Sequence, residues 1–452
     1  MGSPSTFPVA RWLAAHSPNS CGAVQISQPH LLIGWTKAAA AAAAGSCAAG
    51  GGATGSEAEA DSDSKYSYGE TSGLLPFSPP RLPASLDSVG YAPKDENEDV
   101  GVEAVVRAAA AALGRATRLS DVCEVITYRN NMNKLLGTVF DTRAAWAIDA
   151  CLLPPRGEPD AASGDGDTRG SGSGSAQPQG VLFLDIVKEG QEGWRGDPAD
   201  RDRFTRWGYA FEALCTGQAV ADPSSEFGVL LRTRLASHRV LLGAEVDCYD
   251  PQHAQQAQQA LPPQQQAPEQ QAQQAGAAPL QQAGQAQQAG QAHEAQQQAP
   301  NLSSFLELKT YRLPSHPRQQ RSIYQHKHPK WWLQSFLAGV PRLMLGARDD
   351  QGTIHRIDPV ATADLPRLSA QHGVPFHPNQ ALLFGSEALS WMRREAAAHP
   401  GQHLRFSYAG SGADGGGDGS RGGGGAIACA VLAGGQLPQR LQQCLEACGL
   451  AV

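Results

Sequence analysis

Two short stretches of this sequence carry charged side chains within otherwise apolar, strand-like surroundings. GAEVDC contains Glu245 and Asp247, and ELKT contains Glu307 and Lys309. In a strand, residues two apart project from the same face, about 7 Å from one another. If the two stretches form neighbouring strands, three carboxylates and one ammonium group converge there.

Three like charges in a half-buried sheet repel one another strongly unless cations neutralise them. Carboxylate oxygens are the ligands that Mg²⁺ and similar hard divalent ions prefer. Two such ions about 3.5–4 Å apart can hydrolyse a phosphodiester, because one activates water and the other stabilises the leaving oxygen. Lys309 would offset the charge that develops on the phosphate. The alternative is that both pairs are ordinary solvent-facing charges, which pairs of this kind usually are; two of them in apolar strands favour the metal site.

The segments around these charges predict the elements that position them. FGVLLRTRLASHRVLLGAEVDCYD predicts two strands joined by a turn at residues 236–238, and VLFLDIV predicts a buried strand at 181–187. FTRWGYAFEALCTG, residues 204–217, predicts a helix because its large apolar residues recur at three- and four-residue steps.

The remaining ordered segments predict a mixture of strands and helices. An alanine-rich helix precedes the first strands. Strands are expected at 122–141, 144–153, 342–349 and 353–357, helices at about 322–338 and 381–398, and a weak strand and helix at the end.

Four stretches have compositions that do not support a packed core. Residues 1–85 contain an alanine run and an acidic patch, 157–180 are Gly/Ser-rich, 252–300 are almost wholly Gln, Ala, Pro and Gly, and 410–425 are Gly-rich. We expect a disordered N-terminal extension and three flexible insertions in one catalytic domain, residues 86–452. Lengthening a hairpin connection from about 12 to about 50 residues costs only ~1.2 kcal/mol, so the strands beside residues 252–300 can still pair.

Composition excludes several classes of protein. The net charge of −7 argues against a uniformly basic nucleic-acid-binding surface, although a locally basic groove remains compatible with it. Nine cysteines without CxxC pairs argue against a disulfide framework and a zinc ribbon, and favour a reducing compartment. No apolar run approaches the roughly 18 residues that a membrane span needs. MGSPST fits a myristoylation pattern and the acid-poor start allows plastid or other organelle targeting, but both signals are weak.

Several separate motifs then resemble, in order, the DXO-type family of decapping exoribonucleases and NAD-cap hydrolases. TYRNNMNKLL, with Arg129, looks like the first family motif, and WGYAFE, which ends at Glu212, is similar to the second. GAEVDC and ELKT match the next two, and KWWLQSFLAGVP, with Gln334, matches a further stretch. The resemblance runs from about residue 86 to 408, apart from the low-complexity insertions.

This resemblance implies a fold, an activity and a set of site residues. The fold would be α+β, with two mixed β-sheets flanked by helices, related to PD-(D/E)xK nucleases. The activity would be hydrolysis at RNA 5′ ends that releases NAD, incomplete caps or triphosphate groups, together with 5′-3′ exoribonuclease activity, in the nucleus or cytoplasm. Two divalent ions, Mg²⁺ or Mn²⁺, would be held by four acidic side chains and one backbone carbonyl: those of Glu212, Glu245, Asp247 and Glu307, and the carbonyl of Leu308. The phosphates of the RNA would be bound by Lys309, Gln334 and Arg129.

Two other functions remain open. One is a nuclease of the same class that acts on DNA ends, and the other is a binding partner that activates a 5′-3′ exoribonuclease. Basic residues interleaved with aromatic ones at 311–332 could line an RNA path, but Trp331 and Trp332 are interpreted as core. His326 and His328 are two apart on a helix and face different ways, which argues against zinc.

Overall fold

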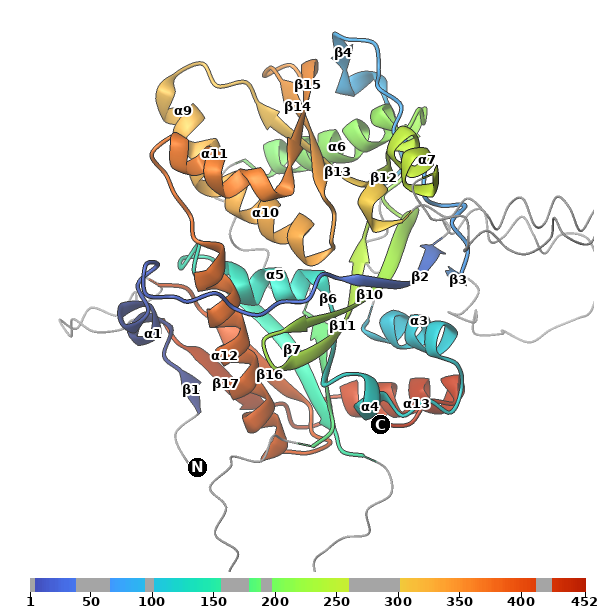
Figure 1. Ribbon diagram of the computed structural model, residues 1–452, viewed down its shortest axis with the longest axis vertical. Coiled ribbons are helices and arrows are strands. Elements are labelled where there is room, and N and C mark those ends of the chain that lie inside the picture. Colours follow the sequence, from blue (N-terminus) through green and yellow to red (C-terminus); the bar gives the residue numbers. More distant parts are fainter. Residues whose placement is uncertain are drawn as a thin grey trace, which may run out of the picture.

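The computed structural model describes residues 5–37, 66–93, 101–155, 179–187, 197–259, 301–411 and 425–452. These residues form an α+β fold with two large mixed sheets, which lie one above the other in Figure 1. A two-stranded sheet pairs β5 (Gly90–Tyr91) with β9 (Val220–Ala221). The two mixed sheets confirm the predicted fold class.

The larger sheet has ten strands and a parallel centre. Strand β6 pairs in parallel with β8 on one side and β11 on the other, and the remaining pairs are antiparallel. In spatial order the strands are β1 (Thr6–Phe7), β17 (Ile427–Val431), β16 (Leu404–Tyr408), β7 (Trp146–Leu153), β8 (Val181–Ile186), β6 (Val125–Tyr128), β11 (His238–Glu245), β10 (Glu226–Leu235), β2 (His30–Lys37) and β3 (Tyr66–Tyr68).

The smaller sheet has five strands. Its β13 pairs in parallel with β14 and antiparallel with β12. In spatial order the strands are β12 (Cys248–Tyr249), β13 (Phe305–Arg312), β14 (Arg342–Arg348), β15 (Thr353–Ala361) and β4 (Ala84–Ser85). The chain therefore passes from the large sheet to the small one between β11 and β12.

Helices cover both sheets and fill the space between them (Figure 1). Helices α5 (Arg129–Gly137) and α12 (Pro378–Ala397) lie on one face of the large sheet, and α3 (Glu103–Leu113) and α13 (Leu437–Cys448) lie on the other. Helix α10 (His328–Leu337) contacts α5, and α6 (Pro198–Cys215) lies on β13. The shorter helices are α1 (Val9–Ala15), α4 (Leu119–Val122), α7 (Pro251–Gln259), α9 (Pro317–Ser322), α11 (Leu365–Gln371), the π-helix η6 (Ile323–Lys327), and the 3₁₀ turns η2 (Leu86–Ser88), η5 (Leu302–Ser304) and η7 (Thr362–Asp364).

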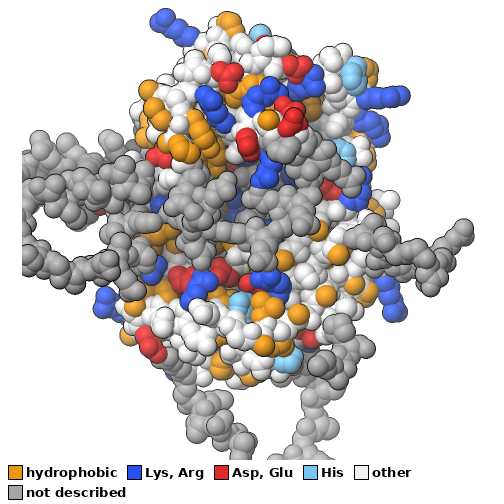
Figure 2. Space-filling model, turned by 180° about the vertical axis from the view of Figure 1, so that it is seen from behind, with side chains coloured by type: hydrophobic (Ala, Val, Ile, Leu, Met, Phe, Trp, Pro, Cys, Tyr) orange, Lys and Arg blue, Asp and Glu red, His pale blue; other side chains and the backbone are white. Residues whose placement is uncertain are grey.

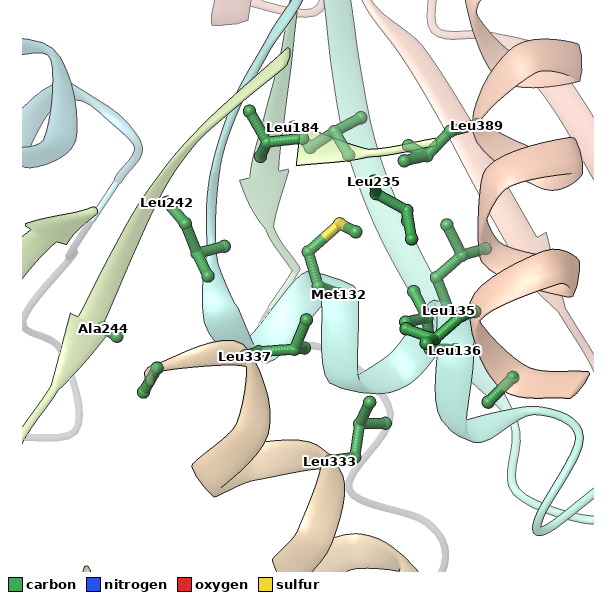
Figure 3. Packing of buried hydrophobic residues seen from close by; sticks show 14 of the residues in the cluster. Met132, Leu135, Leu136, Leu184, Leu235, Leu242, Ala244, Leu333, Leu337 and Leu389 are labelled. Atoms are coloured by element: carbon green, nitrogen blue, oxygen red, sulfur yellow. The ribbon is translucent and has the colours of Figure 1, made fainter. Parts of the chain in front are cut away.

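Helix α5 lies at the centre of the main core and corrects one prediction. Residues 122–141 were predicted as strand, but the strand ends at Tyr128 and a helix begins at Arg129. Met132, Leu135 and Leu136 share one helical face and pack among leucines from strands of the large sheet and from helices α10 and α12 (Figure 3). Three- and four-residue spacing of these apolar residues, rather than alternation, was the signal for a helix.

The N-terminal segment is the second correction, because residues 1–85 were predicted to be disordered. Within it, β2 pairs with β10 and extends the large sheet, and β3 pairs with β2. Trp35 and Trp12 are both buried, and Trp12 donates a hydrogen bond to Glu387 at 2.5 Å. The prediction was based on the composition of residues 1–85 as a whole, in which the short apolar strand β2 is outweighed by low-complexity sequence.

Most other predicted elements are confirmed, including the helix now seen as α6, the β10–β11 hairpin and the strand β8. Most of residues 157–180 and 410–425 lies outside the described residues. The stretch predicted as a loop at 252–300 begins instead with helix α7, and only its first eight residues are described. In the described part of the chain, no helix is both long and apolar enough to cross a membrane.

Candidate active site

The first acidic motif lies where the chain crosses between the two sheets. Glu245 is the last residue of β11, and the Val246 N–H still donates to the Phe227 carbonyl of the large sheet at 3.0 Å. Asp247 follows in the connection, and Cys248 begins β12 of the small sheet. The prediction that both acids lie on one regular strand is therefore wrong, but they stay close enough for the Asp247 charge to raise the pKa of Glu245.

The second motif lies on β13 and contacts the first directly. The Lys309 ammonium lies 2.5 Å from Glu307 Oε1 and 3.6 Å from Asp247 Oδ2. The Leu308 N–H donates to Asp247 Oδ2 at 2.7 Å. Strand β13 thus fixes the Asp247 carboxylate from its backbone and neutralises it from a side chain.

Arg129 reaches the Glu307 carboxylate from the large sheet's side. Its Nη1 lies 3.2 Å from Glu307 Oε2 and also donates to the Gln334 carbonyl at 3.4 Å. As the first residue of α5, Arg129 is 7% exposed, and Glu307 is wholly buried. The buried Glu307 carboxylate therefore receives one cation from strand β13 and one from helix α5, which compensates the cost of its burial.

Glu212 comes to this cluster from α6. The helix lies close to the small sheet because Gly346 leaves room for the Phe211 ring, which a Cβ there would approach within 2.5 Å. Glu212 is half-buried and close enough to Asp247 for the charge of that group to act on it. Burial, followed by the Asp247 charge, raises the pKa of Glu212 well above its usual value.

The other acids differ in how well their charges are compensated. Glu245 is accessible to water but lines a groove; burial among the groove walls, with the charges of Glu226 and Asp247, raises its pKa to about 8. Burial and the Glu307 charge raise the pKa of Asp247 to about 6. Burial would raise the pKa of Glu307 as well, but Lys309 and Arg129 outweigh it and lower the pKa.

Lys309 shows the converse effect. Burial alone would lower the pKa of its ammonium group, but the Asp247 and Glu307 carboxylates raise it. The cluster therefore favours positive charge, and the chemistry of the donor set suits a hard divalent cation.

The acids do not yet form a metal coordination shell. Among the described residues, no group of three or more His, Cys, Asp or Glu side chains is arranged to hold a metal ion. Glu307 Oε1 is buried and accepts no well-aligned hydrogen bond, although the Lys309 ammonium lies within 2.5 Å of it. A buried acceptor with unused lone pairs fits a metal ligand, and Lys309 occupies space beside it.

A cavity of about 430 Å³ lies beside Glu245 at the end of β11. Of the predicted site residues, Arg129, Gln334 and Glu245 line it, whereas Glu212, Asp247, Glu307, Leu308 and Lys309 do not. It is also lined by Trp35 and Lys37 of β2, Tyr66 of β3, and Tyr128 and Glu226. These residues were not identified from the sequence; the short apolar run in HLLIGWTK was the signal available for β2.

Other candidates lie apart from this site. Trp331 and Trp332 are buried, which confirms their interpretation as core. His328 is buried against Ser369, whereas His326 is exposed, so they do not form a metal pair. Over the face drawn in Figure 2, acidic and basic side chains of the described residues are interspersed.

Comparison with known proteins identifies the class of this fold and site. A family model described as "RAI1 like PD-(D/E)XK nuclease" matches residues 177–272 and 284–415, just over half of the chain. The chain therefore belongs to the RAI1-like PD-(D/E)XK nuclease family.

Named relatives and a solved structure agree with this assignment. An Aspergillus fumigatus protein named Decapping nuclease RAI1 is 24% identical over 356 residues, 74% of this chain and 79% of that protein. The human Decapping and exoribonuclease protein is 26% identical over 280 residues, 59% of this chain and 53% of that protein, so the chain spans about half of its length. The crystal structure of Candida albicans Rai1 in complex with pU5-Mn²⁺ matches with a TM-score of 0.58 at 16% identity, over 98% of this chain and 96% of that one.

Proposed function

We propose that this protein is a metal-dependent hydrolase of RNA 5′ ends that removes NAD, incomplete caps or triphosphate groups and digests RNA from its 5′ end. The observation that carries the proposal is the acid cluster at the crossing between the sheets, with Lys309 and Arg129 already on Glu307. The names of the Aspergillus and human relatives support decapping and exoribonuclease activity. The ordered N-terminal strands belong to the same catalytic unit as residues 86–452.

The ligands of two divalent ions, Mg²⁺ or Mn²⁺, would come from both sheets and from α6. When bound, such ions supply charge that activates water and stabilises the leaving oxygen. The Mn²⁺ named with the Candida albicans protein supports this choice of metal. The ligands would be the side chains of Glu212, Glu245, Asp247 and Glu307 and the carbonyl of Leu308.

This chain's cations would hold the substrate during hydrolysis. Lys309 would lie against the scissile phosphate and offset its growing charge, and the Gln334 amide would donate to the same group. Arg129 would contact the phosphates on the 5′ side, because it lines the cavity beside Gln334. Water would add to phosphorus and give up a proton to solvent as the bond to the departing nucleotide breaks, and the departing oxygen would take up a proton from solvent.

This function implies RNA 5′ ends as partners and the nucleus or cytoplasm as the location. A 5′-3′ exoribonuclease remains a candidate protein partner, and plastid targeting or myristoylation remains a weak alternative for the N-terminus.

Two other functions can be separated from this one by direct comparison. A DNA-end nuclease would cleave matched deoxy and ribo substrates equally, whereas recognition of the ribose 2′-OH would favour RNA. A binding partner without catalysis would leave every end intact while co-purifying with a 5′-3′ exoribonuclease. The site's full set of acids favours catalysis.

The double substitution of Glu245 and Asp247 to Ala tests the proposal. Loss of two proposed ligands is expected to reduce release of NAD or cap from RNA by at least about a thousandfold, measured with Mg²⁺ or Mn²⁺ on RNAs that differ only at the 5′ group. Burial and neighbouring acids raise the pKa of both carboxyl groups, which shows that their charges are unfavourable in the folded protein. The double substitution removes this repulsion, so thermal stability should be kept or increased.

The control is Asp364→Ala, which removes an exposed carboxylate paired with Arg367. It should leave activity unchanged. Full activity of the Glu245 and Asp247 double variant would refute the assignment.

A further inference from the structure

The cavity beside the acids has a wall from the N-terminal strands, outside the region that the family model matches. Strand register aligns Trp35 with Gly228 and Gly228 with Glu245. Directly paired residues in a sheet project from the same face. Trp35 is therefore on the face of Glu245, two strand spacings away, which is about 10 Å.

Lys37, two residues after Trp35 on β2, and its partner Tyr66 on β3 extend this wall along the strands. Lys37 is paired with Tyr66 on one side and with Glu226 on the other. All three residues line the cavity. The ring of Tyr66 is stacked on that of Tyr68, with centroids 6.2 Å apart and planes 22° apart, so Tyr66 is held at a fixed angle.

Two glycines let aromatic rings lie flat against the sheet between this wall and Glu245. A Cβ at Gly228 would lie 2.2 Å from the Trp35 ring, so the indole lies over a position that has no side chain. A Cβ at Gly243 would lie 2.7 Å from Val105 and 3.1 Å from the Tyr128 ring. The cavity is therefore bounded by aromatic rings, and Glu245 is the proposed metal ligand that lines it.

This combination of groups suits one ligand chemistry. Aromatic rings stack on nucleobases, and a neighbouring ammonium and carboxylate can bond to the polar edges of a base. The cavity, at about 430 Å³, has room for a single nucleotide rather than a strand. Arg129 lines it too, so phosphates and an attached base would enter together.

We propose that Trp35 and Tyr66 form a subsite for the base of the group that is removed from the RNA 5′ end, with Lys37 and Glu226 at its polar edge. This inference rests on the proposed function and adds to it the residues that select the end group. RNA that ends in NAD or an incomplete cap fills the subsite with a base or nicotinamide ring. RNA that ends in a triphosphate leaves it empty.

The test compares two RNAs that differ only in the 5′ group, NAD or triphosphate, with the full-length protein and Tyr66→Ala. Tyr66 is half-buried, so this variant is expected to fold. We expect kcat/KM to fall about tenfold for NAD-RNA, mainly through KM, and less than about twofold for triphosphate RNA, as expected for loss of one stacking ring. Tyr66→Phe keeps the ring and should keep the wild-type ratio between the two substrates.

Tyr324→Ala is the matched control, because Tyr324 also stacks on a neighbouring ring, that of His372, outside this cavity. A general loss of stability would lower activity on both RNAs and leave their ratio unchanged. An unchanged ratio in Tyr66→Ala, with activity on triphosphate RNA retained, would overturn the subsite while leaving the proposed function standing. A wild-type protein inactive on every RNA end would overturn both.

Discussion

Glu307 is the residue through which the metal ligands and the substrate-binding cations are linked. Both Lys309 and Arg129, which we assign to phosphates, are bound to its carboxylate at 2.5 and 3.2 Å. A divalent ion on Glu307 would compete with both cations for the same oxygens. Metal binding should therefore release the two cations toward RNA, so that metal and RNA bind more tightly together than separately.

Glu307→Gln should uncouple the two events. Without the carboxylate charge, Lys309 and Arg129 are free to meet phosphate even when no metal is present. We expect the variant to bind 5′-phosphorylated, phosphorothioate-linked RNA about tenfold more tightly than wild type in EDTA, the equivalent of about 1.4 kcal/mol. Fluorescence anisotropy with and without Mg²⁺ measures this, and Mg²⁺ should tighten binding only in the wild type.

The thermal stability of Glu307→Gln provides a second measurement. Removing one partner of a buried ion pair leaves the other charge uncompensated, so the melting temperature should fall. Asp364→Asn removes an exposed charge and should alter neither binding nor melting. Equal RNA affinity of wild type and Glu307→Gln in EDTA would contradict the coupling.

Helices and strands with strong local patterns were predictable from the sequence. Helix α6 and the β10–β11 hairpin follow from apolar spacing and a turn, and they position Glu212 and Glu245. The exchange of sheets after Glu245 was not predictable, because it depends on Val246 still bonding to one sheet while Cys248 pairs with the other. Strand β2 was missed for a similar reason: its apolar residues gain their burial from β10, far along the chain.

The long connection between β12 and β13 should tolerate shortening. Cys248 pairs with Leu306 and Tyr249 with Phe305, and the Asp250 N–H donates to the Ser304 carbonyl at 2.8 Å. These contacts hold the two ends of the connection together independently of its middle. Replacing residues 261–299 by about ten Gly and Ser residues roughly halves the loop that the Asp250–Ser304 contact closes, and should stabilise the protein by ~0.7 kcal/mol, since each halving of a loop gives ~0.6 kcal/mol.

The measurement is urea unfolding of the shortened chain beside wild type, together with hydrolysis of NAD-RNA. Activity should stay within about twofold, because the acids on both sides keep their positions on β11 and β13. A shortened chain that folds but loses activity would show that the connection takes part in catalysis.

The protein as a whole should be sensitive to acid, and His328 is one identifiable cause. It is 4% exposed at the start of α10, with Nδ1 3.0 Å from Ser369 Oγ and its ring 4.6 Å from that of Tyr324. Burial, with a smaller effect of His372, lowers the pKa of His328 from 6.5 to about 4. The folded state therefore disfavours the proton that the unfolded chain accepts below pH 6.5.

The sign of the effect follows from that difference. The stability associated with neutral His328 is fully present above pH 6.5 and is lost progressively as the pH falls toward 4. The gap between 6.5 and about 4 corresponds to about 3 kcal/mol. Burial lowers the pKa of His238 too, so this histidine adds to the loss in the same direction.

His328→Asn should make stability less dependent on pH. Asparagine can keep a hydrogen bond to Ser369 but takes up no proton, so the variant should lose less unfolding free energy than wild type between pH 7 and 4.5. Its stability at pH 7 should be lower, because the smaller side chain leaves space beside Tyr324 and Trp331. Urea unfolding at several pH values measures both effects. The exposed His326 provides the control, His326→Asn, which should reproduce the wild-type pH profile; a His328→Asn profile parallel to wild type would exclude His328 as a source of acid sensitivity.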